Sequence, residues 1–337
     1  MGKIVLAVDV GGTKVQAGIF AFPDGWRLGA VPEPIATARY RSQELRGLAI
    51  PMREFLKEHG VKPDTVSVGF AGPVVKGKVK ASNIPWNLDS EELRADLQVP
   101  EVTLLNDLEA AAHGLTHLPP EKLETLQTGT PDSDAMIAVI AAGTGLGEAL
   151  LPKIDGRRIA IPTEGGHGDY AAVGESQIGL LRHLTAQFGR VSYERVLGGP
   201  GIARIYDYLR SVASTPPSAA TEEALAAAAD RSAAVSRLAL EGADPVAVAT
   251  MEMYASIYGA EAGNLAVRSL AYGGLFLAGG IAPKILPFLR LESFRESFCN
   301  KGRASNVAAR CPVHVVLEER LPLLGAAAYG AEHGQDL

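Results

Sequence analysis

Short apolar segments that end in glycine, asparagine or aspartate recur along the whole chain. They predict strands at residues 3–10, 15–20, 66–71, 102–105, 136–141, 149–151, 275–278 and 313–317. Between these segments the apolar positions follow a helical spacing, which predicts helices at residues 175–188, 202–212, 245–270 and 321–331. Because strands and helices alternate along the sequence, we expect an α/β fold.

Polar residues mark the points where several helices should begin. Asp89 has Glu92 three residues later, which is typical of a capping box. Asp244 precedes Pro245, as a capping residue precedes a proline in the first helical turn. An alanine-rich helix is expected to begin at Thr221.

Glycine-rich turns follow three of the predicted strands. They are Gly11-Gly12-Thr13-Lys14, Gly143-Thr144-Gly145-Leu146-Gly147 and Gly279-Gly280. Glycine lets backbone N–H groups approach a ligand closely, and a neighbouring hydroxyl can help to hold phosphate oxygens. The first two turns each join one strand to another, so we interpret them as a weak internal repeat. Three such turns in two halves of the chain favour one nucleotide held between two domains.

Asp9 ends the first predicted strand, directly before the first glycine turn. A carboxylate at this place can act on a hydrated divalent cation. The alternative is a strand that is followed by an ordinary glycine turn. The chain has no Gly-x-x-x-x-Gly-Lys-Ser/Thr sequence and no Gly-x-Gly-x-x-Gly after its first strand, so a P-loop and a Rossmann site are both disfavoured.

The composition restricts the class of protein but leaves its function open. The chain has 337 residues, 47% hydrophobic and 21% charged, as in a soluble protein of one large or two medium domains. Its net charge of −6 argues against a nucleic-acid partner. No apolar run approaches the roughly 18 residues of a membrane span. With only two cysteines, Cys299 and Cys311, and no signal-peptide pattern, we expect a cytoplasmic protein without structural zinc.

Asp107 is the candidate general base. It follows Asn106 at the point where a predicted strand ends and a helix begins. Phosphoryl transfer to a hydroxyl group needs a carboxylate that orients and deprotonates the acceptor. The alternative is that Asp107 only caps the helix. Asn106 supplies a neutral donor and acceptor, which suits a ligand rich in hydroxyl groups.

A second polar cluster lies on the segment Glu164-Gly165-Gly166-His167-Gly168-Asp169, with Glu194 further along the chain. Carboxylates can accept hydrogen bonds from sugar hydroxyls, and a histidine can donate or accept them. A metal site at Glu164, His167 and Asp169 is a weaker alternative, because no second histidine lies nearby in sequence. Glu194 can also be a solvated residue at a helix start.

Six motifs in this order resemble bacterial glucokinases of the hexokinase–actin-like superfamily, over nearly the whole chain. The motifs are Asp9-Val10-Gly11-Gly12-Thr13, Leu105-Asn106-Asp107, Gly143-Thr144-Gly145-Leu146-Gly147, Glu164-Gly165-Gly166-His167, Glu194-Arg195-Val196-Leu197 with Gly199-Pro200-Gly201, and Ala278-Gly279-Gly280-Ile281. The resemblance implies an RNase H-like ATPase fold with two α/β domains and an active site in the cleft between them. It implies a small domain of residues 1–115 with 319–337, to which the C-terminal helix returns, and a large domain of residues 116–318.

The resemblance also implies a role for each matching residue. Asp107 would deprotonate the 6-hydroxyl of glucose. The residues that would bind glucose are Asn83, Asn106, Glu164, His167 and Glu194. The residues that would bind ATP are Asp9, Gly11, Gly12, Thr13, Lys14, Gly143, Thr144, Gly145, Gly279 and Gly280. Asp9 would contact Mg²⁺ through water.

Two features separate this chain from the related repressor–kinase (ROK) group. The cysteine-rich zinc motif of that group is missing, and no helix-turn-helix fits before the first strand. Lys14, in contrast, is the residue found in that group. We therefore expect an ATP-dependent glucokinase that is a homodimer and binds neither nucleic acid nor membrane. The alternatives are a kinase for mannose, fructose or an amino sugar, a sugar sensor without catalysis, and a chaperone or filament ATPase of the same superfold.

Overall fold

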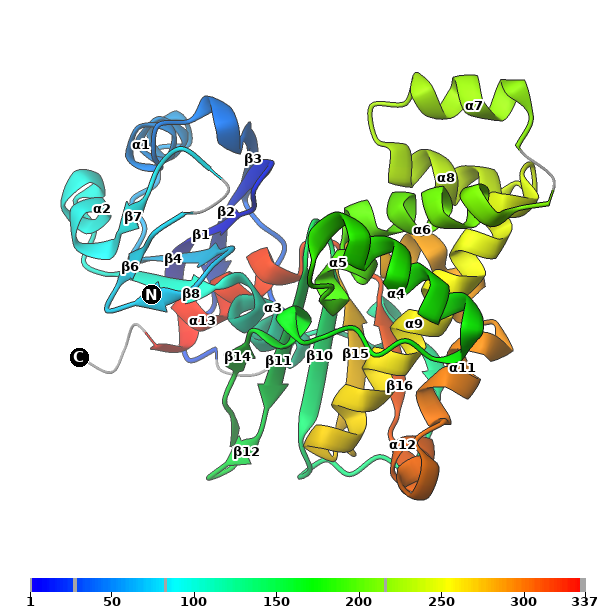
Figure 1. Ribbon diagram of the computed structural model, residues 1–337. Coiled ribbons are helices and arrows are strands. Elements are labelled where there is room, and N and C mark those ends of the chain that lie inside the picture. Colours follow the sequence, from blue (N-terminus) through cyan, green and yellow to red (C-terminus); the bar gives the residue numbers. More distant parts are fainter. Residues whose placement is uncertain (1, 27–28, 82–83, 215–216, 334–337) are drawn as a thin grey trace. The chain divides into compact units, whose positions relative to one another are not determined.

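The computed structural model describes residues 2–26, 29–81, 84–214 and 217–333, which form two compact units (Figure 1). Unit 1 comprises residues 1–122, 154–162 and 318–337, and unit 2 comprises residues 123–153 and 163–317. Among the described residues, no helix combines the length and the apolar character that crossing a bilayer requires.

Unit 1 consists of a five-stranded sheet, a small three-stranded sheet and the helices that pack with them. Its strands are β1 (Lys3–Val10), β2 (Lys14–Phe22), β3 (Ala36–Arg41), β4 (Thr65–Phe70), β5 (Val74–Val75), β6 (Lys78–Val79), β7 (Leu88–Asp89) and β8 (Val102–Asn106). Its helices are η1 (Ser42–Glu44), α1 (Ala49–Glu58), α2 (Ser90–Leu97), α3 (Asp107–Leu115), η2 (Pro120–Lys122) and α13 (Leu321–His333). The short strands β12 (Lys153–Ile154), β13 (Arg157–Arg158) and β14 (Ile161–Thr163) follow one another at the unit boundary.

Unit 2 repeats this design with more helices. Its strands are β9 (Leu123–Gln127), β10 (Ile137–Ala142), β11 (Leu146–Leu151), β15 (Gly274–Ala278) and β16 (Val313–Val316). Its helices are η3 (Gly165–His167), α4 (Gly174–Phe188), α5 (Tyr193–Leu197), α6 (Gly199–Val212), α7 (Ala219–Ala226), α8 (Arg231–Leu240), α9 (Pro245–Ser269), η4 (Ala282–Ile285), α10 (Leu286–Leu289), α11 (Glu292–Cys299), η5 (Gly302–Ala304) and α12 (Ser305–Arg310).

The main sheets of the two units share the strand pairing around their central strands, and the sheet of unit 2 has one further edge strand, β9, which is antiparallel to β16. The strand orders are β3-β2-β1-β4-β8 and β14-β11-β10-β15-β16-β9. In each sheet the central strand, β1 or β10, pairs antiparallel with the next strand in sequence and parallel with a later one. The predicted repeat of strand, glycine turn and strand is therefore correct, and in both units the turn lies at the carboxyl end of a central strand.

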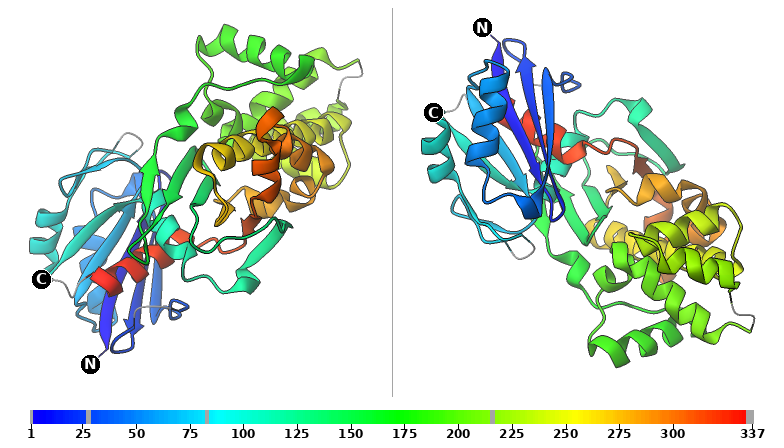
Figure 2. Two further views of the ribbon diagram at one scale, coloured as in Figure 1. Left: turned by 90° about the horizontal axis from the view of Figure 1, so that it is seen from below. Right: turned by 90° about the horizontal axis from the view of Figure 1, so that it is seen from above.

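In unit 1, helices α3 and α13 pack against each other with backbones in near contact. A Cβ atom at Gly325 would lie only 1.7 Å from the carbonyl oxygen of Ala110, and one at Gly114 would lie 2.6 Å from that of Leu321. Figure 2 shows α13, in red, beside the blue strands of the unit, and residues of α13 share a core with Val5 and Ala7 of β1. Glycine at these two positions is therefore what allows α3, and with it Asp107, to lie where it does.

In unit 2, the long helix α9 is buried along most of its length. Its tyrosine hydroxyls find backbone acceptors: Tyr254 Oη donates to the carbonyl of Leu197 (2.7 Å), and Tyr258 Oη donates to that of Ile140 (3.3 Å). Ile140 belongs to β10, which leads into the second glycine turn. These bonds satisfy buried hydroxyls, which would otherwise be costly to bury. The bond of Tyr258 holds α9 against the strand that leads into the turn, and the bond of Tyr254 holds α9 against α5.

Most predicted elements are present, and the differences have local causes. Asp89 and Asp244 cap α2 and α9 as expected. The prediction that a helix begins at Thr221 is wrong. The helix begins at Ala219, and Ser218 caps it, because its Oγ accepts a hydrogen bond from the N–H of Thr221. The predicted strand 149–151 begins earlier, at Leu146, since its first residues are paired to β10.

His113 provides a test of the α3–α13 contact. Its ring lies 5.0 Å from that of Tyr329 and 6.2 Å from that of His333, and burial lowers its pKa to about 4. Because the ordinary pKa is 6.5, the folded protein resists a proton that the unfolded chain accepts, so stability should be complete above pH 6.5 and fall by up to about 3 kcal/mol as the pH drops to 4. Denaturant unfolding at several pH values should show a smaller loss in His113→Phe.

The matched control is His59→Phe, which replaces a histidine at an exposed position after α1. A pH dependence that is equal in the parent and His113→Phe, or that is equally reduced in His59→Phe, would contradict the assignment to His113.

Candidate active site

The first glycine turn is closed by the hydrogen bond from the N–H of Gly11 to the carbonyl of Lys14 (2.9 Å). The strands β1 and β2 pair directly beside it, with Val10 opposite Val15. Thr13 and Lys14 are exposed at the tip. The sequence folds this way because a short connection between two paired antiparallel strands requires backbone conformations that glycine adopts readily.

The turn and Asp107 lie at the same edge of the sheet of unit 1. β1, β4 and β8 are parallel, and their last residues Val10, Phe70 and Asn106 are aligned in register. With one strand between them, β1 and β8 are about 10 Å apart. The carboxyl ends of parallel strands are where open α/β sheets bind ligands.

Asp9 is a carboxyl group that burial holds partly in its neutral form. Desolvation raises its pKa from 3.8 to about 6, and the charge of Lys14 opposes this shift. A positive charge placed beside Asp9 would favour the carboxylate. In the part of the chain that the structure describes, no three His, Cys, Asp or Glu residues are grouped so that they could hold a metal ion by themselves. A single carboxylate nevertheless fits hydrated Mg²⁺, which keeps most of its waters.

Asn106, and not Asp107, caps helix α3. Its Oδ1 accepts the N–H groups of Leu108 (3.0 Å) and Glu109 (3.4 Å), its Nδ2 donates to the carbonyl of Gly72 (3.0 Å), and Glu109 completes a capping box. Asp107 is the first residue of the helix, and its Oδ1 accepts from Leu108 N–H (2.9 Å). The capping alternative for Asp107 is therefore wrong, and Asn106 has a structural role that the sequence analysis did not assign.

The second glycine turn lies against the start of helix α6. Gly143 N–H donates to the carbonyl of Gly145 (2.9 Å), and the carbonyl of Gly143 accepts from Gly199 N–H (2.7 Å). A Cβ atom at Gly198 would lie 3.0 Å from the carbonyl oxygen of Thr144. The glycines that follow α5 are thus required for this turn to pack against the helix.

Glu164, His167 and Glu194 come together in unit 2. His167 lies between the two carboxylates, with Nε2 3.6 Å from Glu164 Oε2 and Nδ1 3.9 Å from Glu194 Oε1. The other oxygen of Glu194 accepts from the N–H of Leu146, at the end of the second glycine turn (3.2 Å). The Glu164 and His167 side chains are 71% and 58% exposed, so their polar atoms are available to a ligand.

Asn83 lies outside the described residues. Gly279, after β15, has φ +85°, and a Cβ atom on it would lie 2.3 Å from the carbonyl oxygen of Ala142, so only glycine fits there. Gly280 has open space around it.

The alternative of a metal site at Glu164, His167 and Asp169 lacks its third ligand, because Asp169 pairs with Arg190 (2.7 Å).

Glu148 is a buried residue beneath this cluster that the sequence analysis missed. It is 2% exposed, and a Cβ atom at Gly165 would lie 2.1 Å from its Oε2, so the loop that carries Glu164 rests directly on it. Burial first, and then the neighbouring carboxyl group of Glu261, raise its pKa to about 7, against the influence of Arg268. The only sequence feature that could have indicated Glu148 is its place as the one acidic residue in the otherwise apolar segment 146–151.

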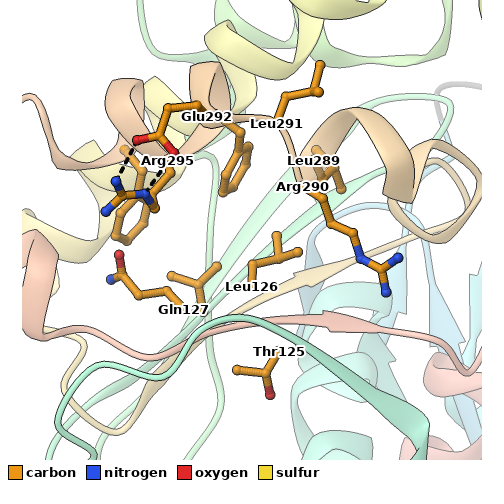
Figure 3. A pocket seen from close by; sticks show the side chains of 11 residues that line it. Thr125, Leu126, Gln127, Leu289, Arg290, Leu291, Glu292 and Arg295 are labelled. Atoms are coloured by element: carbon orange, nitrogen blue, oxygen red, sulfur yellow. Dashed lines mark hydrogen bonds and ion pairs between the residues drawn. The ribbon is translucent and has the colours of Figure 1, made fainter.

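A small cavity of about 110 Å³ lies elsewhere in unit 2, between β9 and the helices α10 and α11 (Figure 3). Its charged groups are already paired, Arg295 with Glu292 (2.5 Å) and Arg290 with Glu124 (2.6 Å). None of the predicted site residues that the structure describes lines it. We do not regard it as the candidate site.

Comparison with known proteins gives a consistent result. The model of the family "Glucokinase" matches residues 6–333. A glucokinase from Nostoc sp. strain PCC 7120 is 37% identical, over 97% of this chain and 99% of its own. The crystal structure of a glucokinase from an Antarctic psychrotroph has a TM-score of 0.83 at 29% identity, covering 97% of this chain and 98% of its own. A ROK family glucokinase from Streptomyces griseus, in complex with glucose and AMPPNP, shares the fold with a TM-score of 0.65 at 21% identity, over 97% of this chain and 99% of its own.

The buried position of Glu148 gives a stability prediction. Because its pKa is about 7 in the folded protein and ordinarily 4.5, the folded state binds the proton more tightly. Stability from this group should therefore be complete below pH 4.5 and decrease by up to about 3 kcal/mol as the pH rises to 7. Glu148→Gln mimics the neutral form, so it should match the parent at low pH and be more stable than the parent at pH 8.

Urea unfolding at pH 5 and pH 8 measures this difference. Glu252→Gln, at an exposed position of α9, removes the same charge without burial and serves as the control. Equal destabilisation of Glu148→Gln at both pH values would show that the carboxyl group is needed for a reason other than its protonated state.

Proposed function

We propose that this chain, which belongs to the glucokinase family, transfers the γ-phosphoryl group of ATP to the 6-hydroxyl of glucose. Membership of the family makes it an ATP-dependent sugar kinase with the two-domain actin-like ATPase fold. The observation that carries the choice of glucose is the cluster Glu164–His167–Glu194, in which each of the two carboxylates lies within 4 Å of the imidazole of His167. Such a group can hydrogen-bond several hydroxyls of one sugar.

In this proposal Asp107 is the general base. As phosphoryl transfer proceeds, the 6-hydroxyl oxygen forms a bond to the γ-phosphorus, the bond to the β–γ bridging oxygen breaks, and the hydroxyl proton passes to Asp107. Asn106 supports this role, because its capping of α3 fixes the first helical residue. Unit 2 supplies Glu164, His167 and Glu194 as sugar-binding side chains, and we propose Asn83 and Asn106 as further ones.

The glycine turns are proposed to bind the nucleotide. The residues proposed for the phosphates are Gly11, Gly12, Thr13, Lys14, Gly143, Thr144 and Gly145, and those proposed for the adenosine are Gly279 and Gly280. Asp9 would hold hydrated Mg²⁺, since its half-buried carboxyl gains from a nearby cation. When bound, Mg²⁺ neutralises charge on the phosphates. We further propose a homodimer in the cytoplasm, where the free thiols Cys299 and Cys311 stay reduced.

A coupled assay with ATP and Mg²⁺ across glucose, mannose, fructose and glucosamine tests the function. The proposal requires the highest kcat/KM for glucose. A higher value for another hexose would replace glucose as the substrate, and binding of sugar without turnover would make the protein a sensor.

Asp107→Asn should lower kcat by about a hundredfold to ten-thousandfold, the usual range for loss of a general base. The amide keeps an oxygen that can accept from Leu108 N–H, so folding and glucose binding should be retained. Turnover is measured by the coupled assay, and glucose binding by calorimetry. Turnover within threefold of the parent would remove Asp107 from the mechanism.

Gly145→Ala should weaken glucose binding without unfolding the protein. The added Cβ would lie 2.5 Å from Glu194 Oε2, the end of a side chain that can move away. We expect the Kd for glucose to rise about tenfold, since a displaced carboxylate loses a hydrogen bond of about 1.5 kcal/mol. Gly166→Ala is the contrast, because its Cβ meets the backbone carbonyl of Leu146 at 2.0 Å and should lower the melting temperature instead. An unchanged glucose Kd in Gly145→Ala would argue against Glu194 as a sugar ligand.

A further inference from the structure

The carbonyl groups of the turn after β1 all accept hydrogen bonds from the residues of η1. Ser42 Oγ donates to Gly11 O (2.6 Å), and the Ser42 N–H donates to Thr13 O (3.2 Å). Between them, Gln43 Nε2 donates to Gly12 O (3.3 Å). The segment that follows β3 therefore holds three consecutive carbonyls of the turn on one side.

This arrangement also decides where the N–H groups of the turn point. In a trans peptide group the C=O and the N–H of the next residue point in opposite directions. With the carbonyls of Gly11 and Gly12 directed toward η1, the N–H groups of Gly12 and Thr13 are directed away from it. Within the described ranges, neither N–H group has an acceptor in the protein. Two adjacent amides oriented in this way form a concavity that can bind an anion.

Ser42 is itself fixed by Trp86. Ser42 is fully buried, and its carbonyl accepts from the indole Nε1 of Trp86 (3.0 Å). Trp86 is 6% exposed, and its ring stands edge-on to that of Phe70 (5.8 Å between centroids, 90° between planes). Phe70 ends β4 and is aligned with Val10, the last residue before the turn. The chain of contacts thus runs from the core of unit 1 through Trp86 and Ser42 to the turn.

We propose that Ser42 is a positioning residue for the phosphoryl donor, and that Trp86 keeps Ser42 in place. This inference rests on the proposed function, in which the turn binds the phosphates of ATP. Without the Ser42 hydroxyl, the peptide group between Gly11 and Gly12 loses its anchor and can rotate, so its N–H no longer meets the phosphate. The lost bond fixes the turn of unit 1 itself, whereas three of the proposed sugar-binding side chains, Glu164, His167 and Glu194, belong to unit 2, so the effect should be much larger for ATP than for glucose.

Ser42→Ala tests the proposal. The apparent KM for ATP should rise about tenfold or more, because a misaligned amide loses most of its hydrogen bond to phosphate. The Kd for glucose, measured by calorimetry, should stay within twofold of the parent. Ser67→Ala is the matched control: Ser67 is fully buried on β4 of the same sheet, and its hydroxyl has no partner among the described residues, so it removes a buried hydroxyl without touching the turn.

Two further variants examine the contacts on either side of Ser42. Gln43→Ala removes the exposed side chain that binds Gly12 O, and it should raise the KM for ATP about threefold even if Ser42→Ala fails to fold. Trp86→Phe keeps a ring against Phe70 but loses the indole N–H, so it should raise the KM for ATP as well. If Trp86 acts through Ser42, the double variant Ser42→Ala/Trp86→Phe should be little worse than Ser42→Ala alone.

The outcomes separate this inference from the proposed function. A parent protein that phosphorylates no hexose overturns both. A parent that phosphorylates glucose, with a KM for ATP in Ser42→Ala and Gln43→Ala within twofold of that in Ser67→Ala, overturns the role of η1 alone. A rise in glucose Kd equal to the rise in ATP KM would show a general structural defect instead of donor positioning. Fully additive effects in the double variant would overturn the link through Trp86.

Discussion

The direction of a few peptide groups at the carboxyl end of β1 is the constraint on which the candidate site in unit 1 depends. A turn of three residues between two paired strands cannot satisfy all of its own backbone groups. Here Ser42 and Gln43 donate hydrogen bonds to the carbonyls, and the opposed N–H groups of Gly12 and Thr13 have no acceptor among the described residues. In our proposal the backbone of this turn binds phosphate because neighbouring residues occupy only its acceptor side.

In unit 2 the corresponding constraint is close approach of the backbone to acidic side chains. Gly145 leaves room for the Glu194 carboxylate, and Gly165 leaves room for that of Glu148. Any larger residue at these positions would displace a carboxylate or the loop itself. Gly145 and Gly165 therefore determine where the two carboxylates lie, in addition to forming turns.

The position of Asp107 depends on a third contact, far from the glycine turns in sequence. Helix α3 begins at the sheet edge because Asn106 caps it, and it lies close to α13 because Gly114 and Gly325 have no side chains. Helix α13 therefore supports helix α3, whose first residue is the candidate base Asp107. The buried His113 lies in the same contact, which connects its pH dependence to the stability of this helix pair.

The sequence by itself determined the strand–turn–strand repeat, the helix caps at Asp89 and Asp244, and the identity of the family. These features depend on local patterns: apolar periodicity, capping residues and glycines at strand ends, all of which can be recognised within a few neighbouring residues. It also indicated Glu164, His167 and Glu194 as one group, although the 3.6 and 3.9 Å contacts became visible only in the structure.

Tertiary structure alone decided the parts that involve residues distant in sequence. From the sequence only Asp107 was considered as a cap of α3, and the hydrogen bonds of Asn106 to Leu108, Glu109 and Gly72 showed that Asn106 is the cap. Glu148 and Ser42 gave almost no signal, because a single acidic residue in a strand or a serine after one is common. Their importance comes from what lies against them, Gly165 in one case and the Gly11 carbonyl in the other, and such contacts depend on chain segments 17 and 31 residues away.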